Sequence, residues 1–322
     1  MKSFDELHNL KRLLHKHDVS LSNWVELSQR GFSGARIYRQ HNREGASYIL
    51  KVTSADFDWI MRATSDSKCR EAILANARIR HDRIGSPAIG SAQDSSVFSI
   101  LMQDISECLL SNERVTKDQL QTILLGASHL HSLPPPAGVD VPWCTIEDRL
   151  TLFMPNPEKL VSFRIANDIL AGWELFFDYA PKNIGDTVRS LFNDLGPLKR
   201  ALDQLPNCFL HGDLKLDNIG ISSDGTVSLI DWSMSMLAPA AIDLGWFMAM
   251  NSRASPISLD DVLMYYTSCG VIERRLHDRH HALTILCGLM LRGWRKALDA
   301  KAGDPAELHW WCERASSATK IL

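Results

Sequence analysis

The sequence predicts an α+β protein in two parts: a small antiparallel sheet with one inserted helix over residues 1–105, and a larger, mostly helical part over residues 106–322. Three observations carry this prediction. Runs of β-branched and aromatic residues, bounded by turn residues, are concentrated in the first part. Apolar residues at helical spacing dominate the second part. Between residues 209 and 231 the period changes again, and short strand-like segments flank a polar loop.

The first part is expected to begin with an amphipathic helix over residues 1–18 and to contain five strands. Apolar residues near helical spacing, Ala72, Ala75 and Ile79, predict the inserted helix over residues 68–79. The strands are expected over residues 24–27, 36–39 and 48–53, and over two segments between 88 and 100 that flank a turn at 93–95.

The second part reads as helices interrupted by one strand-rich segment. An apolar helix is expected to end before the prolines at 134–136, and Ser223-Asp224-Gly225-Thr226 is typical of a hairpin turn. Helices resume at about Ile242 and continue to the end. The remaining helices are expected over residues 118–133, 167–179 and 186–205.

The composition is that of a folded protein without a strong attraction to nucleic acid. The chain has 322 residues, 45% of them hydrophobic, and a formal net charge of −3. This charge gives no global attraction to phosphate backbones or anionic membranes, so neither is expected as a partner. Seven single cysteines without a Cys-x-x-Cys pair suit a reduced compartment. The longest apolar stretch is far shorter than the roughly 20 residues of a membrane span, so a cytoplasmic protein is expected.

The strongest chemical signal is His-Gly-Asp-Leu-Lys-Leu-Asp-Asn over residues 211–218, followed by Leu-Ile-Asp-Trp over residues 229–232. Phosphoryl transfer needs a carboxylate that accepts or orients the proton of the attacking hydroxyl, and oxygen ligands that hold Mg²⁺ on the nucleotide phosphates. Asp213 suits the first role. Asn218 and Asp231 suit the second, as metal ligands. The alternative for each residue alone is a turn or a local cap.

This arrangement resembles the catalytic loop and metal aspartate of the kinase-like superfamily. With His-Gly-Asp, and Ile-Asp-Trp in place of Asp-Phe-Gly, it is similar to the aminoglycoside phosphotransferase and choline kinase-like family over about residues 20–250. The resemblance implies a protein-kinase-like fold of two lobes, with ATP and Mg²⁺ as cofactors. It also implies a small-molecule substrate whose hydroxyl group receives the γ-phosphoryl group.

The resemblance also assigns roles upstream of this motif. The turn Gly31-Phe32-Ser33-Gly34 would cover the phosphates, with Ser33 and Gly34 binding them. Lys51 would pair with the phosphates and Glu71 would hold this lysine. Taken alone, each feature has an ordinary explanation: a chance Gly-x-x-Gly, an edge-strand lysine and a solvated helix glutamate.

Further roles follow from the same resemblance. Gln103 and Ile105 would bond the adenine through backbone groups, and Met102 is equally plausible as core. Lys215 would contact the transferred phosphoryl group as a second catalytic residue. Asp243 lies in an apolar run and would hold the catalytic loop through backbone hydrogen bonds, which is a structural role.

Two other functions fit the same motifs. A catalytically silent nucleotide-binding module would be favoured by loss of the motif residues, yet Lys51, Asp213, Asn218 and Asp231 are all present. A protein kinase would carry arginine where Gly212 stands, and it would need a longer activation segment than the interval between Asp231 and the next helix.

The acceptor is expected to be neutral or weakly charged: a sugar, an antibiotic or a metabolite. From Arg253 onward, 8 acidic residues stand against 10 basic ones, whereas a polycationic acceptor needs an acidic lining. Folding could still gather distant acids, such as Asp260, Asp261 and Glu313, into one cleft. Trp294, or the pair Trp310–Trp311, is expected near the cleft mouth, with plain core as the alternative. Finally, three histidines lie near Asp278: His277, His280 and His281. This cluster suggests either a metal site or, more simply, a solvated helix end.

Overall fold

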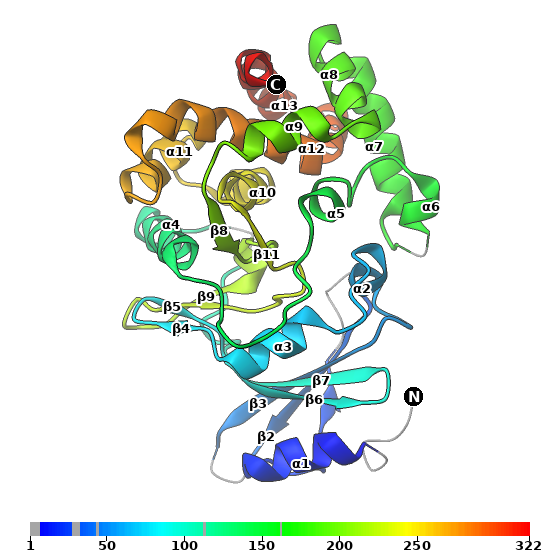
Figure 1. The fold of residues 1–322 in the computed structure, drawn as a ribbon, viewed down its shortest axis with the longest axis vertical. Coiled ribbons are helices and arrows are strands. Elements are labelled where there is room, and N and C mark those ends of the chain that lie inside the picture. Colours follow the sequence, from blue (N-terminus) through cyan, green and yellow to red (C-terminus); the bar gives the residue numbers. More distant parts are fainter. Residues whose placement is uncertain (1–6, 28–32, 43–44, 112–113, 162) are drawn as a thin grey trace.

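A five-stranded antiparallel sheet forms the N-terminal part of the protein in a computed structural model, which describes residues 7–27, 33–42, 45–111, 114–161 and 163–322 (Figure 1). The strand order is β1-β2-β3-β7-β6, and every neighbouring pair is antiparallel. The strands are β1 (Val25–Glu26), β2 (Arg36–His41), β3 (Ser47–Thr53), β6 (Ala88–Asp94) and β7 (Val97–Gln103).

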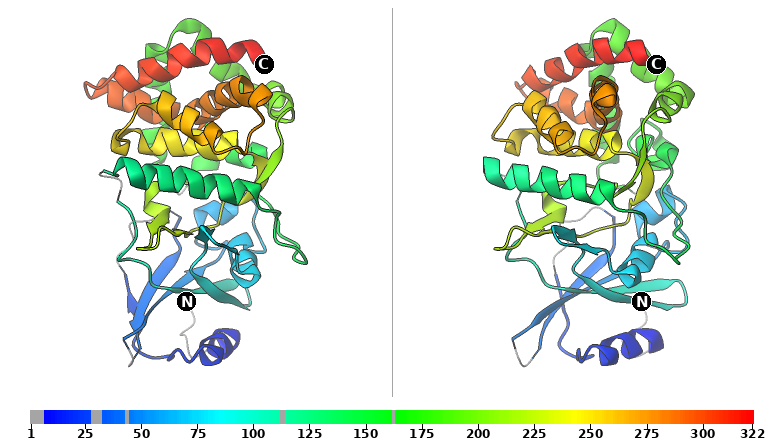
Figure 2. Two further views of the ribbon diagram at one scale, coloured as in Figure 1. Left: turned by 90° about the vertical axis from the view of Figure 1, so that its left-hand side faces the viewer. Right: turned by 60° about the vertical axis from the view of Figure 1, so that its left-hand side comes forward.

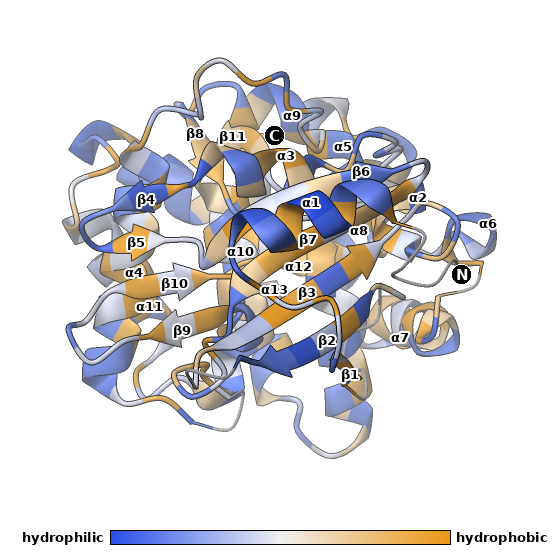
Figure 3. Cartoon of the chain, turned by 90° about the horizontal axis from the view of Figure 1, so that it is seen from below, coloured by the Kyte–Doolittle hydropathy of each residue, from blue (hydrophilic) through white to orange (hydrophobic). Residues whose placement is uncertain are grey.

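Helices cover both faces of this sheet. On one face, α1 (His8–Lys16) packs Leu10 and Leu14 against Leu50 and Leu101. Figure 3 shows α1 lying across the sheet, with the apolar strands β3 and β7 beneath it. On the other face, α3 (Arg70–Ala77) packs against Ile100 and its neighbours in β7. Because side chains alternate along a strand, Leu50 and Val52 face α1 and Lys51 between them faces α3.

Helices form most of the C-terminal part, as Figures 1 and 2 show. The long helix α12 packs against α7, α10 and α13, and α4 lies between the other helices and the sheet region (Figure 2). The helices are α4 (Lys117–Ser132), α5 (Ile146–Leu150), α6 (Pro157–Leu160), α7 (Ala166–Tyr179), α8 (Lys182–Asn193), α9 (Gly196–Leu202), α10 (Ala241–Asn251), α11 (Leu259–Ser268), α12 (His277–Lys301) and α13 (Ala306–Ala318). Short 3₁₀ turns occupy Leu216–Asn218, Ser252–Ala254, Arg274–Leu276 and Thr319–Ile321.

Two small sheets position the polar loop. In the four-stranded sheet β4-β5-β10-β9, strand β10 pairs with β5 from the N-terminal part and with β9, so this sheet joins the two parts. Strands β8 and β11 form a two-stranded sheet. The strands are β4 (Arg80–His81), β5 (Ile84–Gly85), β8 (Asn207–Leu210), β9 (Ile219–Ile221), β10 (Val227–Leu229) and β11 (Met236–Pro239).

The predicted elements agree with the structure except in a few places. The single helix expected over residues 186–205 is wrong, because Asp194 is extended and a separate helix, α9, begins at Gly196 with Pro197 in its first turn. The first part contains a second inserted helix, α2 (Trp59–Ala63), capped by Asp58. The hairpin turn at 223–226 connects β9 to β10 as predicted. The division at residue 105 stays a prediction.

Across the residues that the structure describes, no helix combines the length and the apolar character needed to span a membrane.

Candidate active site

Residues 211–218, called here the 211–218 loop, connect β8 to β9. The imidazole of His211 is fully buried beneath this loop, and its Nε2 donates to the Ile230 carbonyl at 3.0 Å. Its Nδ1 accepts from the Asp213 N–H at 3.3 Å. Burial lowers the pKa of His211, so the ring is neutral with its proton on Nε2. The ring therefore fixes the spacing between this loop and the segment after β10.

Gly212 is required by the path of the loop. Its φ of +81° lies in the left-handed region, and a Cβ at this position would lie 1.9 Å from the Met234 carbonyl oxygen. A side chain here would force two backbone segments apart.

Asp243, in the first turn of α10, holds the start of the loop. Its carboxylate accepts the backbone N–H groups of His211 and Gly212 at 2.9 and 2.8 Å, as the resemblance implied. His131 contacts the same carboxylate at 3.2 Å and Tyr266 from its other ring nitrogen. Burial opposes ionisation, yet the hydrogen bonds from His131 and the backbone keep the pKa of Asp243 below its ordinary value.

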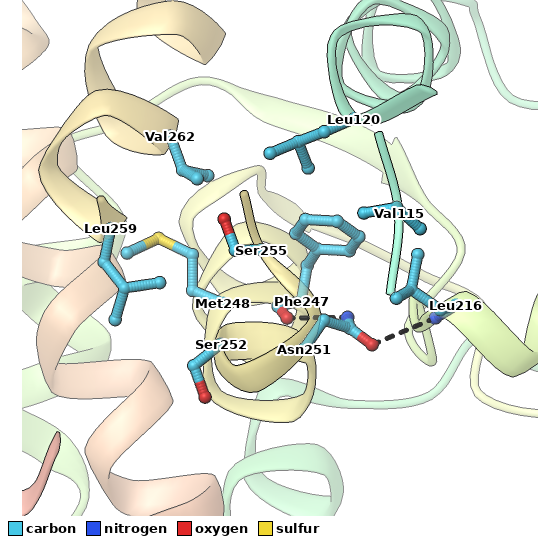
Figure 4. Close-up of a pocket in the computed structure, with 10 residues that line it drawn as sticks. All are labelled: Val115, Leu120, Leu216, Phe247, Met248, Asn251, Ser252, Ser255, Leu259 and Val262. Atoms are coloured by element: carbon cyan, nitrogen blue, oxygen red, sulfur yellow. Dashed lines mark hydrogen bonds between the residues drawn. The ribbon is translucent and has the colours of Figure 1, made fainter. Parts of the chain in front are cut away.

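The far end of the loop is held by Asn251, at the C-terminus of α10. Its Oδ1 accepts the Leu216 N–H at 3.1 Å, and its Nδ2 donates to the Phe247 carbonyl at 2.7 Å (Figure 4). The apolar cavity beside it measures only about 10 Å³ and cannot hold a substrate. Helix α10 thus fixes both ends of the loop.

Asp213 accepts hydrogen bonds from three side chains. Trp246 Nε1 donates to Oδ1 at 2.7 Å, and Lys215 Nζ and Asn218 Nδ2 donate to Oδ2 at 2.7 and 2.9 Å. Asn218 Nδ2 also donates to the Asp213 carbonyl at 2.9 Å. These donors fix the orientation of the carboxylate.

Lys51 links the sheet to the segment after β10. Its Nζ lies 2.6 Å from Glu71 Oε2 and 2.8 Å from Asp231 Oδ1. The strand period turns Lys51 toward α3, and Glu71 lies in the first turn of that helix. Asp231 adopts a φ of +64°, an uncommon conformation for a residue with a side chain.

The charges of this group depend on each other. Burial opposes the charge on Lys51, but the carboxylates of Asp231 and Glu71 raise its pKa well above the ordinary value. Burial likewise opposes ionisation of Asp231, and the ammonium groups of Lys51 and Lys215 nevertheless lower its pKa. Burial raises the pKa of Glu71 to about 7. Of the two carboxylates that contact Lys51, Asp231 is therefore the one that is held in its ionised form.

One cavity of about 600 Å³ brings the polar residues together. The 211–218 loop, the segment after β10 and helices α2, α5, α10 and α12 line it. Of the predicted site residues, five contribute to its wall, and they are Ser33, Asp213, Lys215, Asn218 and Asp231. Lys51 does not line the cavity itself but bonds Asp231, which does, and Glu71 bonds Lys51.

The other predicted residues lie outside this wall. Gly34 has a φ of +98°, and a Cβ there would lie 2.2 Å from the Phe57 carbonyl oxygen, so Gly34 packs tightly against the segment that precedes α2. Gly31 and Phe32 fall outside the described residues. Gln103 is exposed at the end of β7, and its N–H donates to the Pro87 carbonyl. Because Pro87 has no N–H to return, the Gln103 carbonyl remains suited to bond a base.

The chemistry of these side chains fits a hard cation. Asn218 donates only through its amide nitrogen, which leaves its carbonyl oxygen for a metal, and Asp231 faces the same cavity. Amide and carboxylate oxygens are the ligands that Mg²⁺ prefers. No cluster of three or more His, Cys, Asp or Glu side chains suited to a metal occurs in the described part of the chain. A metal held here would therefore keep other ligands, such as phosphate oxygens.

Sequence reasoning missed the wall that adjoins the 211–218 loop. Trp246, Phe153 and Phe163 supply its aromatic side chains, and Arg149 and Arg292 supply guanidinium groups. Trp246 follows Asp243 in the apolar run of α10, where it is indistinguishable from a core tryptophan. The arginines carry no sequence signal, because neither belongs to a motif, and Arg292 is one of several basic residues on its helix.

The expected aromatic residues are elsewhere, so the prediction of a tryptophan from the last 70 residues near the cleft mouth is wrong. Trp294 and Trp311 are 1% exposed in the core, and Trp310 bonds Asp260 beside Arg314. His280 does not belong to a solvated helix end, because it is fully buried against Tyr266. The acids named as a possible cationic lining do not line the cavity.

Comparison with known proteins agrees with this architecture. The profile described as "Phosphotransferase enzyme family" matches residues 24–283. A search of curated protein sequences gave no significant match.

Solved structures share the fold at low sequence identity. An ethanolamine kinase from Plasmodium vivax aligns with a TM-score of 0.56 and 16% identity, over 96% of this chain and 86% of the other. A thermostable mutant of aminoglycoside phosphotransferase APH(4)-Ia, in complex with ADP and hygromycin B, aligns with a TM-score of 0.51 and 13% sequence identity over 97% of each chain. A choline/ethanolamine kinase family protein from Mesorhizobium loti aligns with a TM-score of 0.50 and 16% sequence identity, over 93% of this chain and 88% of the other. The predicted kinase-like fold of two lobes is confirmed.

Proposed function

The chain belongs to the phosphotransferase enzyme family, and we propose that it transfers the γ-phosphoryl group of ATP, held with Mg²⁺, to a hydroxyl group of a small molecule. One observation carries the proposal. A single cavity joins Asp213, a carboxylate that can accept a proton, to the oxygen ligands Asn218 and Asp231. The hydroxyl oxygen attacks the γ-phosphorus, the bond to ADP breaks, and the hydroxyl proton passes to Asp213.

The other residues act on charge and position. Lys51, held by Glu71 and Asp231, would neutralise phosphate oxygens of the nucleotide. Lys215 Nζ, which bonds Asp213, would contact the transferred phosphoryl group and help to neutralise its charge. Ser33 and Gly34 would lie over the phosphates, and the Gln103 carbonyl and the Ile105 N–H would bond the adenine. Mg²⁺, when bound to Asn218 and Asp231, would neutralise the charge on the phosphates.

The chain keeps each group that a silent binding module would have lost, and three of them, Asp213, Asn218 and Asp231, line one cavity. A protein kinase is disfavoured by the same geometry. Strand β11 and helix α10 follow Asp231 almost directly, which leaves no room for a long activation segment. The substrates named for the structural neighbours, hygromycin B and ethanolamine, support an acceptor of small size.

Acceptor-dependent release of ADP, measured across a panel of hydroxylated small molecules, tests the proposal. Asp231→Ala removes one of the two proposed metal ligands and should abolish turnover at saturating Mg²⁺, because the phosphates then lack their counter-charge. Asp224→Ala changes an aspartate in the exposed β9–β10 turn and should be near wild type. Near-full activity of Asp231→Ala would show that the metal site is assigned to the wrong residues.

A further inference from the structure

Two guanidinium groups stand in the cavity wall formed by α5 and α12. Arg149 is 1% exposed; its Nε donates to the Gly212 carbonyl at 2.7 Å, while its Nη1 is buried without a hydrogen-bond partner. Arg292 is partly buried, and its Nε also lacks a partner. Both side chains line the cavity. Donors of this kind, inside a wall, are suited to bind a ligand that accepts hydrogen bonds.

Neither charge is balanced by the protein. Neither guanidinium forms an ion pair with a carboxylate anywhere in the described ranges of the chain, although a buried charge is costly without one. Asp213 is the carboxylate that most offsets the burial of Arg149, but it already accepts bonds from three side chains. Burial lowers the pKa of both arginines, that of Arg292 to about 10. An anion in the cavity would relieve this imbalance.

Trp246 connects these charges to the reacting end of the cavity. The guanidinium carbons of Arg149 and Arg292 lie 4.4 and 5.9 Å from its ring centroid. Its Nε1 donates to Asp213 Oδ1 at 2.7 Å. A group bound by the arginines would therefore lie beside the carboxylate proposed to receive the hydroxyl proton. The remaining wall is apolar, with Phe153 and Phe163 among its members.

We propose that the acceptor is a small hydroxylated anion, whose carboxylate or phosphate group binds Arg149 and Arg292 while its hydroxyl group faces Asp213. This inference rests on the proposed phosphotransfer and narrows its acceptor. Guanidinium groups suit both anions, because their planar donors match two acceptor oxygens. A cationic amine would instead face two like charges in this wall.

The experiment compares acceptors that share a carbon skeleton and differ in charge. One series is glycerate, glycerol 3-phosphate, glycerol and 2-amino-1,3-propanediol, and the other is gluconate, glucose 6-phosphate, glucose and glucosamine. Binding to the enzyme loaded with Mg²⁺ and a non-hydrolysable ATP analogue is measured by calorimetry, and ADP release is measured with ATP. Anionic members should bind and be used in preference to neutral and cationic ones. Comparing the carboxylate members of the two series with the phosphate members identifies which anionic group the enzyme recognises.

Arg292→Gln keeps a hydrogen-bonding side chain, although a shorter one, and removes the charge. It should weaken anion binding by about 10- to 100-fold, the loss expected for one charge-assisted hydrogen bond, with nucleotide binding unchanged. Arg149→Lys should weaken anion binding as well. The matched control is Arg295→Gln on the same helix, because Arg295 pairs with Asp299 and does not line the cavity.

Three results would overturn the inference: preference for neutral or cationic members, equal anion binding by Arg292→Gln, or no anion binding by an enzyme that still binds nucleotide. Failure of the proposed function looks different. In that case the wild-type protein would bind no Mg²⁺–nucleotide, or it would release no ADP with any acceptor, whatever its charge.

Discussion

Asp213 and Lys51 show how much of the proposed chemistry depends on single side chains. Asp213 lies at the centre of a hydrogen-bond network with donors from α10 and from its own loop. Lys51 sits between two buried carboxylates from different segments. The first is placed to act on the acceptor, and the second on the nucleotide. Their substitutions should therefore change different kinetic constants.

Asp213→Asn keeps the size of the side chain but cannot take a proton. We expect kcat to fall by about 10²–10⁴-fold, the range for a lost acid–base group, while nucleotide affinity changes little. Lys51→Ala should lower both kcat and nucleotide affinity, because it removes the charge that meets the phosphates. Steady-state kinetics and nucleotide titration separate the two effects. Small and equal effects would instead favour a nucleotide-binding module without activity.

At the scale of elements, α10 organises the site. Asp243 at its start and Asn251 at its end hold the 211–218 loop from behind, and Trp246 between them bonds Asp213 from inside the cavity. One rigid helix thus carries the support of the loop and part of the acceptor wall. This arrangement predicts that the support can be weakened without touching the reacting groups.

Asp243→Asn tests this support. The amide would turn an N–H₂ group toward one of the backbone donors of His211 and Gly212, leaving that donor unsatisfied. We expect a loss of about 1–3 kcal/mol in the free energy of unfolding, and a fall in kcat with little change in the pH dependence of the rate. Chemical denaturation and kinetics measure both. Wild-type stability would show that the buried carboxylate does not hold the loop.

Helix α12 contributes an acid-sensitive position in the core. His280 is fully buried against Tyr266, both of its ring nitrogens lack partners, and burial lowers its pKa to about 3. Between that value and the ordinary pKa near 6.5, the unfolded chain binds a proton that the folded chain does not. Stability should therefore fall as the pH drops from about 6.5 toward 3, and this dependence should be lost in His280→Leu.

The size of the effect follows from the same two pKa values. Between about pH 7.5 and pH 5, wild type should lose about 2 kcal/mol more of its free energy of unfolding than His280→Leu. His309→Leu alters an exposed histidine on α13 and should leave the pH dependence as in wild type. Parallel stability curves for wild type and His280→Leu would contradict this origin of the acid sensitivity.

At the scale of the whole molecule, the sequence was informative where function depends on neighbours in the chain. Asp213, Asn218 and Asp231 lie within one loop–hairpin unit, so their spacing alone indicated their roles. Lys51 and Glu71 could be proposed only through the resemblance to the family, and the strand period of β3 is what turns Lys51 toward Glu71 in the structure. Arg149, Trp246 and Arg292 come from three helices that meet only by tertiary packing, and no local pattern distinguishes them from ordinary helix residues.

The same reasoning explains the errors in the helical part. The tryptophans of the last 70 residues were candidates for the cavity only by composition. Packing decides such cases: Gly172 of α7 lets the backbone of Trp294 approach closely, which places that indole in the core. The break between α8 and α9 was marked by Gly196-Pro197, a local signal that the apolar pattern over residues 186–205 had obscured.

Nucleotide binding should connect the two lobes. Lys51 and Glu71 belong to the N-terminal part, whereas Asn218 and Asp231 belong to the C-terminal part, so a Mg²⁺–nucleotide bound as proposed would stabilise the lobes relative to each other. By linkage, ADP at about 100 times its Kd adds about 2.7 kcal/mol to the stability of the folded state. We expect Mg²⁺ with ADP to raise the melting temperature by several degrees, ADP with a chelator to raise it much less, and Asp231→Ala to remove the Mg²⁺-dependent part. Scanning calorimetry with and without Mg²⁺ measures each contribution. An equal shift with ADP in the presence of chelator would mean that the nucleotide is held without the metal, and that Asn218 and Asp231 have another role.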